Sequence, residues 1–169
     1  MVENILVLLL ILVGVALIAS IINLASRDKS IDKNLGKISF KESMDLVDLP
    51  VITFFNNGKK FNFLLDTGSS HSSFNLESIE GVLGNPIEGD YTHFIGADGN
   101  PKPTQFVTMP IVYKDKEYQE DFQVIDLSKA FGVIKSESGV NLHGILGNSF
   151  FQKYKYVINF DELIVYSLK

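Results

Sequence analysis

The residues best suited to do chemistry are Asp66, Thr67, Gly68 and Ser69, which follow an apolar stretch at residues 61–65. A carboxylate at the end of a strand, turned by Thr and Gly, can project into a cleft. Two such carboxylates about 3 Å apart cannot both ionise, so the pair shares one proton and supplies both an acid and a base. Such a pair can activate a water molecule against a peptide carbonyl. Because this chain carries the motif once, the second carboxylate would have to come from a second copy of the chain.

Two further segments accompany this motif in the sequence. Residues 145–147 are two apolar residues and a glycine, and a short helical pattern follows them. Residues 94–100 form a glycine-bearing segment between the two motifs, which predicts a hairpin. The alternative interpretation is that residues 66–69 are an ordinary hairpin end, since Asp, Thr and Gly are common in turns.

In these motifs the chain resembles the retropepsin-like aspartic proteases, a family of half-sized, dimeric relatives of pepsin. The resemblance rests on residues 64–69, 94–100 and 145–147 and covers roughly residues 45–169. It implies peptide-bond hydrolysis in a homodimer, with a peptide or protein substrate and no cofactor. A protease-like domain without activity, used as a peptide-binding or interaction module, is the alternative function.

The resemblance implies a role for each residue of the first motif. Asp66 would be the catalytic carboxylate, and Thr67 would hydrogen-bond the facing subunit's loop and hold the pair of carboxylates rigid. Gly68 would let the backbone approach that pair without a Cβ clash. Ser69 would hydrogen-bond the carboxylate, although capping of the next turn is an equally good interpretation.

The second motif would pass beneath the active-site loop. The side chains of Ile145 and Leu146 would be buried, and Gly147 would permit close packing. Asn148 and Ser149 stand where relatives often carry Arg or Met followed by Asp or Asn. The resemblance therefore does not extend to the dimer-bracing salt bridge of those relatives.

The hairpin between the two motifs stands where the family carries its flap. Gly96, Ala97, Asp98 and Gly99 would form the tip, whose small side chains allow closure over an extended peptide and exclusion of water. An ordinary exposed hairpin is the alternative.

The elements that must position these residues are short strands. Residues 51–55 and 61–65 flank an Asn-Gly turn, which predicts a hairpin. Further strand pairs are predicted at residues 107–113 with 118–125 and at 156–160 with 163–166. Short helical turns are expected at residues 73–79, 127–131 and 149–154, and a polar loop at residues 136–141. This pattern predicts an all-β fold, a small closed acid-protease barrel spanning residues 49–169.

The residues before the barrel predict a membrane anchor. After a short tail at residues 1–4, residues 5–25 contain no charge and would span about 31 Å as a helix, enough to cross a hydrocarbon core. A cleaved signal peptide is the alternative, but no basic residue precedes the apolar run, which is also long for such a peptide. Residues 26–48 are polar and predict a juxtamembrane linker.

The charge distribution predicts the orientation and excludes some partners. The basic residues near the span all follow it, which favours a single-pass protein of the cell membrane with a cytoplasmic C-terminal domain: Arg27, Lys29, Lys33 and Lys37. The net charge is −5 and no basic stripe is present, so nucleic acid is not an expected partner. The three histidines are scattered without metal-ligand spacing, so no metal site is predicted.

Overall fold

The computed structural model describes residues 36–87, 92–95 and 101–168. By their contacts, residues Lys37–Lys169 form one compact unit, separate from Met1–Gly36. The predicted tail, the apolar span at residues 5–25, most of the linker and the flap tip at residues 96–99 lie outside the described residues. Among the helices in the described part of the chain, none is long and apolar enough to cross a membrane.

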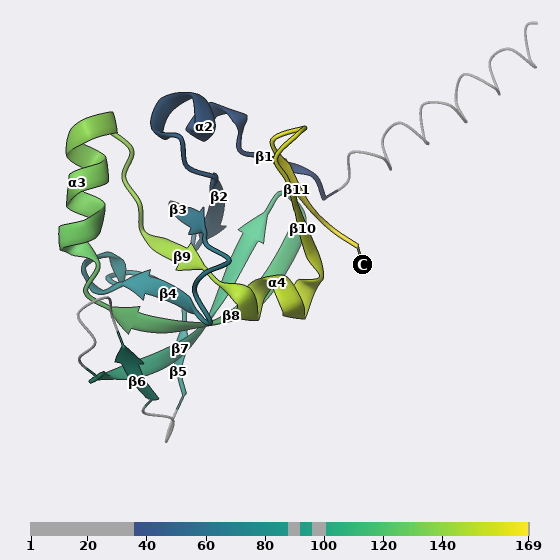
Figure 1. The fold of residues 1–169 in the computed structure, drawn as a ribbon. Coiled ribbons are helices and arrows are strands. Elements are labelled where there is room, and N and C mark those ends of the chain that lie inside the picture. The colour runs from purple at the N-terminus through teal and green to yellow at the C-terminus, as the bar shows by residue number, and fades with distance from the viewer. Residues whose placement is uncertain (1–35, 88–91, 96–100, 169) are drawn as a thin grey trace, which may run out of the picture. The chain divides into compact units, whose positions relative to one another are not determined.

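A closed barrel of six strands forms the body of this unit (Figure 1). Its strands are hydrogen-bonded in the order β2-β3-β9-β4-β8-β7, and β7 returns to pair with β2 through Phe55 and Val112. The strand bounds are β2 (Val51–Asn56), β3 (Lys59–Leu65), β4 (Ser72–Asn75), β7 (Pro101–Tyr113), β8 (Lys116–Ile125) and β9 (Gly144–Leu146). The predicted β barrel is therefore confirmed in outline.

The β2–β3 hairpin follows directly from its turn residues. Asn57 and Gly58 both have positive φ, 49° and 74°, as expected for a two-residue turn of this kind. Beyond the turn, β3 alternates its side chains, so that Phe61, Phe63 and Leu65 are buried. Burial of each such side chain contributes about 1.5–3 kcal/mol, which fixes the register of β3 and hence the place where it ends, immediately before Asp66.

Aromatic side chains fill the core around β3. Phe54, Phe63 and Phe122 are fully buried. The Phe54 and Phe63 rings meet edge to face with centroids 6.0 Å apart, and Phe63 stacks on Phe122 at 5.5 Å. Such pairs add to the stabilisation that comes from buried area alone.

Two short strands pair with β7 outside the barrel order given above. Strands β5 (Asn85–Pro86) and β6 (Thr92–Ile95) each pair antiparallel with β7, and the β6 pairing runs up to Ile95 opposite Pro101. For the hairpin predicted at residues 94–100, the strand pairing is confirmed at Phe94 and Ile95, and residues 96–100 lie outside the described residues. The predicted pair 107–113 with 118–125 is also present, as the longer β7–β8 hairpin.

A second sheet joins the two ends of the unit, in the order β1-β11-β10. Its strands are β1 (Ile38–Ser39), β10 (Tyr156–Asn159) and β11 (Ile164–Ser167), and helix α2 (Lys41–Val47) follows β1. Ile38 and Phe40 are only 2% and 1% exposed. Residues 37–48, expected to be linker, thus form part of the folded unit. A two-residue strand and a seven-residue helix are too short to show periodicity in the sequence.

The remaining helices differ in part from expectation. Helix α4 (Asn148–Tyr154) lies where a short helix was predicted, but α3 (Ser128–Ser138) is a full helix that includes part of the expected polar loop. Only Phe131 of α3 is buried, so its apolar pattern is weak. The predicted turn at residues 73–79 is wrong in its first half: these residues belong to β4, and only Leu76–Ser78 are helical. All four residues of β4 are buried, so β4 shows no alternation.

Candidate active site

The Asp66 loop starts at the end of β3 and is held there by the backbone. The Asp66 N–H donates to the Leu146 carbonyl at 3.0 Å, and the Ser69 N–H donates to the Asp66 carbonyl at 3.2 Å, which closes a tight turn. The Gly68 N–H donates to Asp66 Oδ1 at 2.8 Å. Asp66 is half-buried, and the turn residues Thr67 and Gly68 are exposed. The carboxylate is therefore oriented by its own loop while Asp66 remains partly exposed to solvent.

The strand order explains why this loop must cross another segment. Strand β9 lies between β3 and β4, parallel to β3 and antiparallel to β4. The chain leaves β3 at Asp66 and returns in β4 at Ser72, so residues 66–71 must pass over the point where β9 ends. The two sequence motifs, about 80 residues apart, are brought together at this crossing.

Gly147 lies at the crossing and is tightly confined. A Cβ atom there would lie 2.5 Å from the His71 carbonyl oxygen and 2.9 Å from that of Ser69. Both neighbours are backbone atoms and cannot swing aside. The following Asn148 and Ser149 N–H groups donate to Ser69 O at 2.8 Å and to Ser70 O at 3.1 Å. The close packing expected of Gly147 thus has a geometric basis, a crossing with no room for a side chain.

The other residues of the two motifs make contacts within the same chain. Leu146 is fully buried and Ile145 is half-buried. The Thr67 carbonyl accepts a hydrogen bond from Asn148 Nδ2 at 2.8 Å. The Ser69 hydroxyl donates to the His71 carbonyl at 2.8 Å. Within the single chain, then, Ser69 stabilises its own turn, which is the alternative that the sequence left open.

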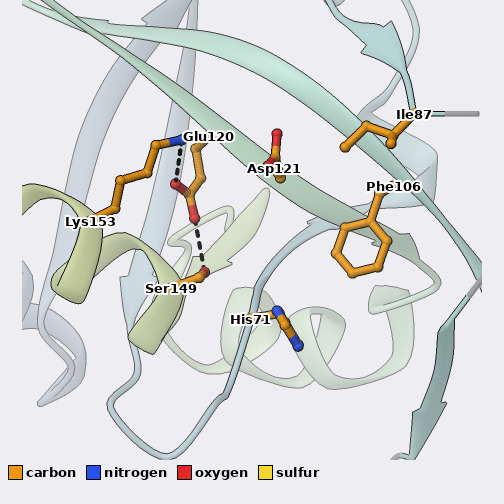
Figure 2. A pocket seen from close by; sticks show the side chains of 7 residues that line it. All are labelled: His71, Ile87, Phe106, Glu120, Asp121, Ser149 and Lys153. Atoms are coloured by element: carbon orange, nitrogen blue, oxygen red, sulfur yellow. Dashed lines mark hydrogen bonds and ion pairs between the residues drawn. The ribbon is translucent and has the colours of Figure 1, made fainter. Parts of the chain in front are cut away.

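A buried carboxylate that the sequence analysis did not identify lies close to this crossing. Glu120 on β8 is 1% exposed. Its Oε1 accepts hydrogen bonds from the hydroxyls of Ser72 at 2.8 Å and Ser149 at 2.9 Å, and Lys153 Nζ lies 3.8 Å from Oε2. In Figure 2, Ser149 and Lys153 extend from α4 toward Glu120. In the sequence Glu120 is one of several acidic residues in a polar stretch, and only the buried positions of its neighbours Tyr118 and Phe122 mark its inward face.

A pocket of about 290 Å³ opens beside these residues (Figure 2). The His71 ring meets the Phe106 ring edge to face at 5.7 Å. The pocket is lined by His71, Ile87, Phe106, Glu120, Asp121, Ser149 and Lys153. This lining combines apolar, aromatic and charged side chains. In the part of the chain that the structure describes, no group of three or more His, Cys, Asp or Glu residues is arranged to hold a metal ion.

Burial raises the pKa of Glu120 above its ordinary value of 4.5, although the hydrogen bonds from Ser72 and Ser149 and the charge of Lys153 act in the opposite direction. A carboxyl whose pKa is raised on folding stabilises the fold most fully below its unfolded pKa, and this contribution is lost as the pH rises through its folded pKa. Wild-type Glu120 is therefore expected to cost stability at neutral pH.

We accordingly expect Glu120→Gln to raise the melting temperature at pH 7 by a few degrees, about 2–4 °C for each kcal/mol gained. The gain should shrink as the pH falls and disappear below about 4.5, where Glu120 is neutral in both the folded and the unfolded state. Thermal unfolding followed by circular dichroism between pH 4 and 8 measures both effects. Glu117→Gln, at an exposed position on the same strand, is the matched control. A uniform loss of stability at every pH would contradict the expectation.

Comparison with known proteins gives two findings. No known protein family matches the chain by its sequence profile. Among solved structures, the chain is similar to the crystal structure of a retropepsin-like aspartic protease from Rickettsia conorii, with 21% sequence identity and a TM-score of 0.48 over 77% of this chain and 87% of that chain.

Proposed function

We propose that the chain is a retropepsin-like aspartic endopeptidase, in which Asp66 from each of two copies forms the catalytic pair. The observation that carries the proposal is the crossing at Gly147. There the Asp-Thr-Gly loop and the apolar-apolar-Gly segment form one hydrogen-bonded unit at the end of β3, with Asp66 N–H bound to Leu146 O at 3.0 Å. An ordinary hairpin end would not require the second segment.

The chemistry follows from two carboxyl groups that share a proton. The ionised Asp66 would take a proton from a water molecule as the water oxygen adds to the peptide carbonyl carbon. The protonated Asp66 of the second copy would donate to the carbonyl oxygen. Breakage of the C–N bond then returns a proton to the leaving nitrogen. The reaction requires neither a metal nor an organic cofactor.

The substrate we infer is an extended peptide. Strand β7 pairs with β6 near the predicted flap, and the same strand supplies Phe106 to the pocket beside the Asp66 loop. Gly96, Ala97, Asp98 and Gly99 would form the tip that closes over the peptide. The pocket would hold one of its side chains.

The test is cleavage of a broad peptide library by the purified full-length chain over pH 4–8. Mass spectrometry of the products would identify the cleaved bonds. Cleavage with a reproducible side-chain preference supports the proposal. Peptide binding without cleavage at any pH would contradict it and would favour the catalytically silent binding module.

We also propose that residues 5–25 anchor the protein in the cell membrane, with the folded unit on the cytoplasmic side. The support is the uncharged run of residues followed by a cluster of basic residues. Resistance of the full chain to alkaline extraction from membranes tests the anchor, and complete release would contradict it.

If Asp66 from each of two copies forms the catalytic pair, a copy with an inactive Asp66 variant should inactivate the wild-type copy with which it dimerises. Mixing wild-type protein with a roughly tenfold excess of Asp66→Asn should reduce the activity per wild-type chain by about tenfold, because random pairing leaves few dimers with two working carboxyls. The measurement is peptide cleavage after the subunits have exchanged. Wild-type protein diluted with an equal mass of albumin is the control. Unchanged activity per wild-type chain, with a monomer by light scattering, would rule out the shared pair.

A further inference from the structure

The buried carboxylate of Glu120 connects three segments of the chain that meet near the Asp66 loop. Glu120 lies on β8, Ser72 is the first residue of β4 and directly follows the loop, and Ser149 lies in the first turn of α4. The two serine hydroxyls are 3.4 Å apart. Both are bonded to the same oxygen, Glu120 Oε1, at 2.8 and 2.9 Å.

Backbone N–H groups donate to both serine hydroxyls. The Gly147 N–H donates to the Ser72 hydroxyl oxygen at 3.2 Å, and the Ser72 N–H donates to that of Ser149 at 3.1 Å. Each hydroxyl thus receives a backbone proton and has one proton of its own to give. Both of these protons are directed at Glu120 Oε1, which can accept them on its two lone pairs. One acceptor oxygen therefore completes both chains of hydrogen bonds.

These two series of hydrogen bonds end on the segments that form the crossing. Gly147 passes under the loop, and its predecessor Leu146 accepts the Asp66 N–H. Ser72 fixes the other end of the loop, where it enters β4. Loss of the Glu120 acceptor would leave at least one hydroxyl proton without a partner, because the two hydroxyls could exchange only one weak hydrogen bond at 3.4 Å, and it would loosen both segments.

We propose that Glu120 is a positioning residue for Asp66. Through Ser72 and Ser149 it holds the Asp66 loop against Gly147, so that the Asp66 carboxylate can pair with Asp66 of the second copy. This inference rests on the proposed function for its catalytic consequence. The hydrogen-bond clamp itself can be measured without any catalysis.

The surroundings of Glu120 indicate that the acceptor oxygen, and not the charge, performs this role. Lys153 on α4 faces Oε2, but its side chain is 46% exposed. It also donates to the Gln119 carbonyl. Two other titratable groups interact electrostatically with Glu120, Asp121 on β8 and Tyr154 on α4. His71 also lines the pocket. Glutamine supplies the same acceptor without charge, whereas methionine has a similar length and lacks the oxygen.

The test compares Glu120→Met with Glu120→Gln in the full-length protein. Glu117→Met, an exposed site on β8, is the matched control. We expect Glu120→Met to speed amide hydrogen exchange at Ser72 and Gly147 by at least about tenfold, while Ile158 and Val165 in the second sheet stay within about twofold. The kcat for peptide cleavage should fall about tenfold or more. Glu120→Gln should keep the wild-type exchange rates at Ser72 and Gly147, and Glu117→Met should resemble wild type in all these measurements.

Ser149→Ala provides a milder variant in case Glu120→Met does not fold. It should speed exchange at Ser72, which loses its acceptor, more than at Gly147. Equal acceleration at all four amides, or unchanged exchange at Ser72 and Gly147, would overturn the clamp. Altered exchange with an unchanged kcat would overturn the positioning role. Altered exchange in a wild-type protein that cleaves no peptide would leave the clamp standing and refute only the proposed function.

Discussion

Asp66→Asn is expected to reduce peptide cleavage by about a thousandfold or more, because it removes the only group in the motif that can accept a proton from water. The fold should be little affected. Asparagine keeps an Oδ1 atom, which can still accept the hydrogen bond that the Gly68 N–H donates at 2.8 Å. We therefore expect the melting temperature and the dimer to stay close to wild type while kcat falls.

The measurement is the initial rate of cleavage of a peptide taken from the library, with melting temperature and light scattering recorded on the same samples. Asp45→Asn is the matched control, since Asp45 is exposed on α2. Full activity of Asp66→Asn protein expressed in a protease-deficient host would exclude Asp66 as the catalytic group.

Gly147→Ala is expected to have a large effect on stability, although it adds only one methyl group. The new Cβ would lie 2.5 Å from the His71 carbonyl oxygen and 2.6 Å from its carbon. Backbone atoms of the Asp66 loop would have to move, at a cost of about 1–3 kcal/mol or more. The φ of −98° and ψ of −171° at Gly147 are open to any residue, so the cost comes from contact and not from backbone strain.

The expected result is a melting temperature about 2–12 °C lower, at about 2–4 °C for each kcal/mol lost, together with a loss of cleavage. Gly132→Ala is the matched control: it lies in α3 with nothing within 4 Å of its Cβ position, and alanine is favoured over glycine in a helix. Gly132→Ala should therefore be neutral or stabilising. A Gly147→Ala protein as stable as wild type would show that the loop can yield, contrary to a rigid crossing.

Local sequence signals were sufficient for the elements that position Asp66. The Asn57-Gly58 turn requires two positive φ angles, and the alternating residues of β3 require one buried face. Together they determine where β3 ends, so Asp66 could be located at a strand end from the sequence. The pairing of β10 with β11 could be predicted for the same reason, since both strands are near neighbours in the chain.

Elements that depend on distant partners could not be predicted in this way. Strand β1 exists because Ile38 pairs with Val165, and β4 is buried between β8 and β9 from other parts of the chain. Neither contains enough residues to produce a periodic pattern of its own. Helix α3 has one buried side chain, too few to distinguish a helix from a polar loop.

The same division applies to the site. The sequence by itself determined the two motifs and their order, because each is a run of adjacent residues. Only the tertiary structure decided that Gly147 lies against the backbone of His71 and that Glu120 accepts both serine hydroxyls. Those contacts join residues separated by 29 to 76 positions, and they arise from the placement of β9 between β3 and β4. Packing of the whole core selects a strand order of this kind, and its contacts join residues far apart in the chain. No short stretch of sequence therefore predicts it.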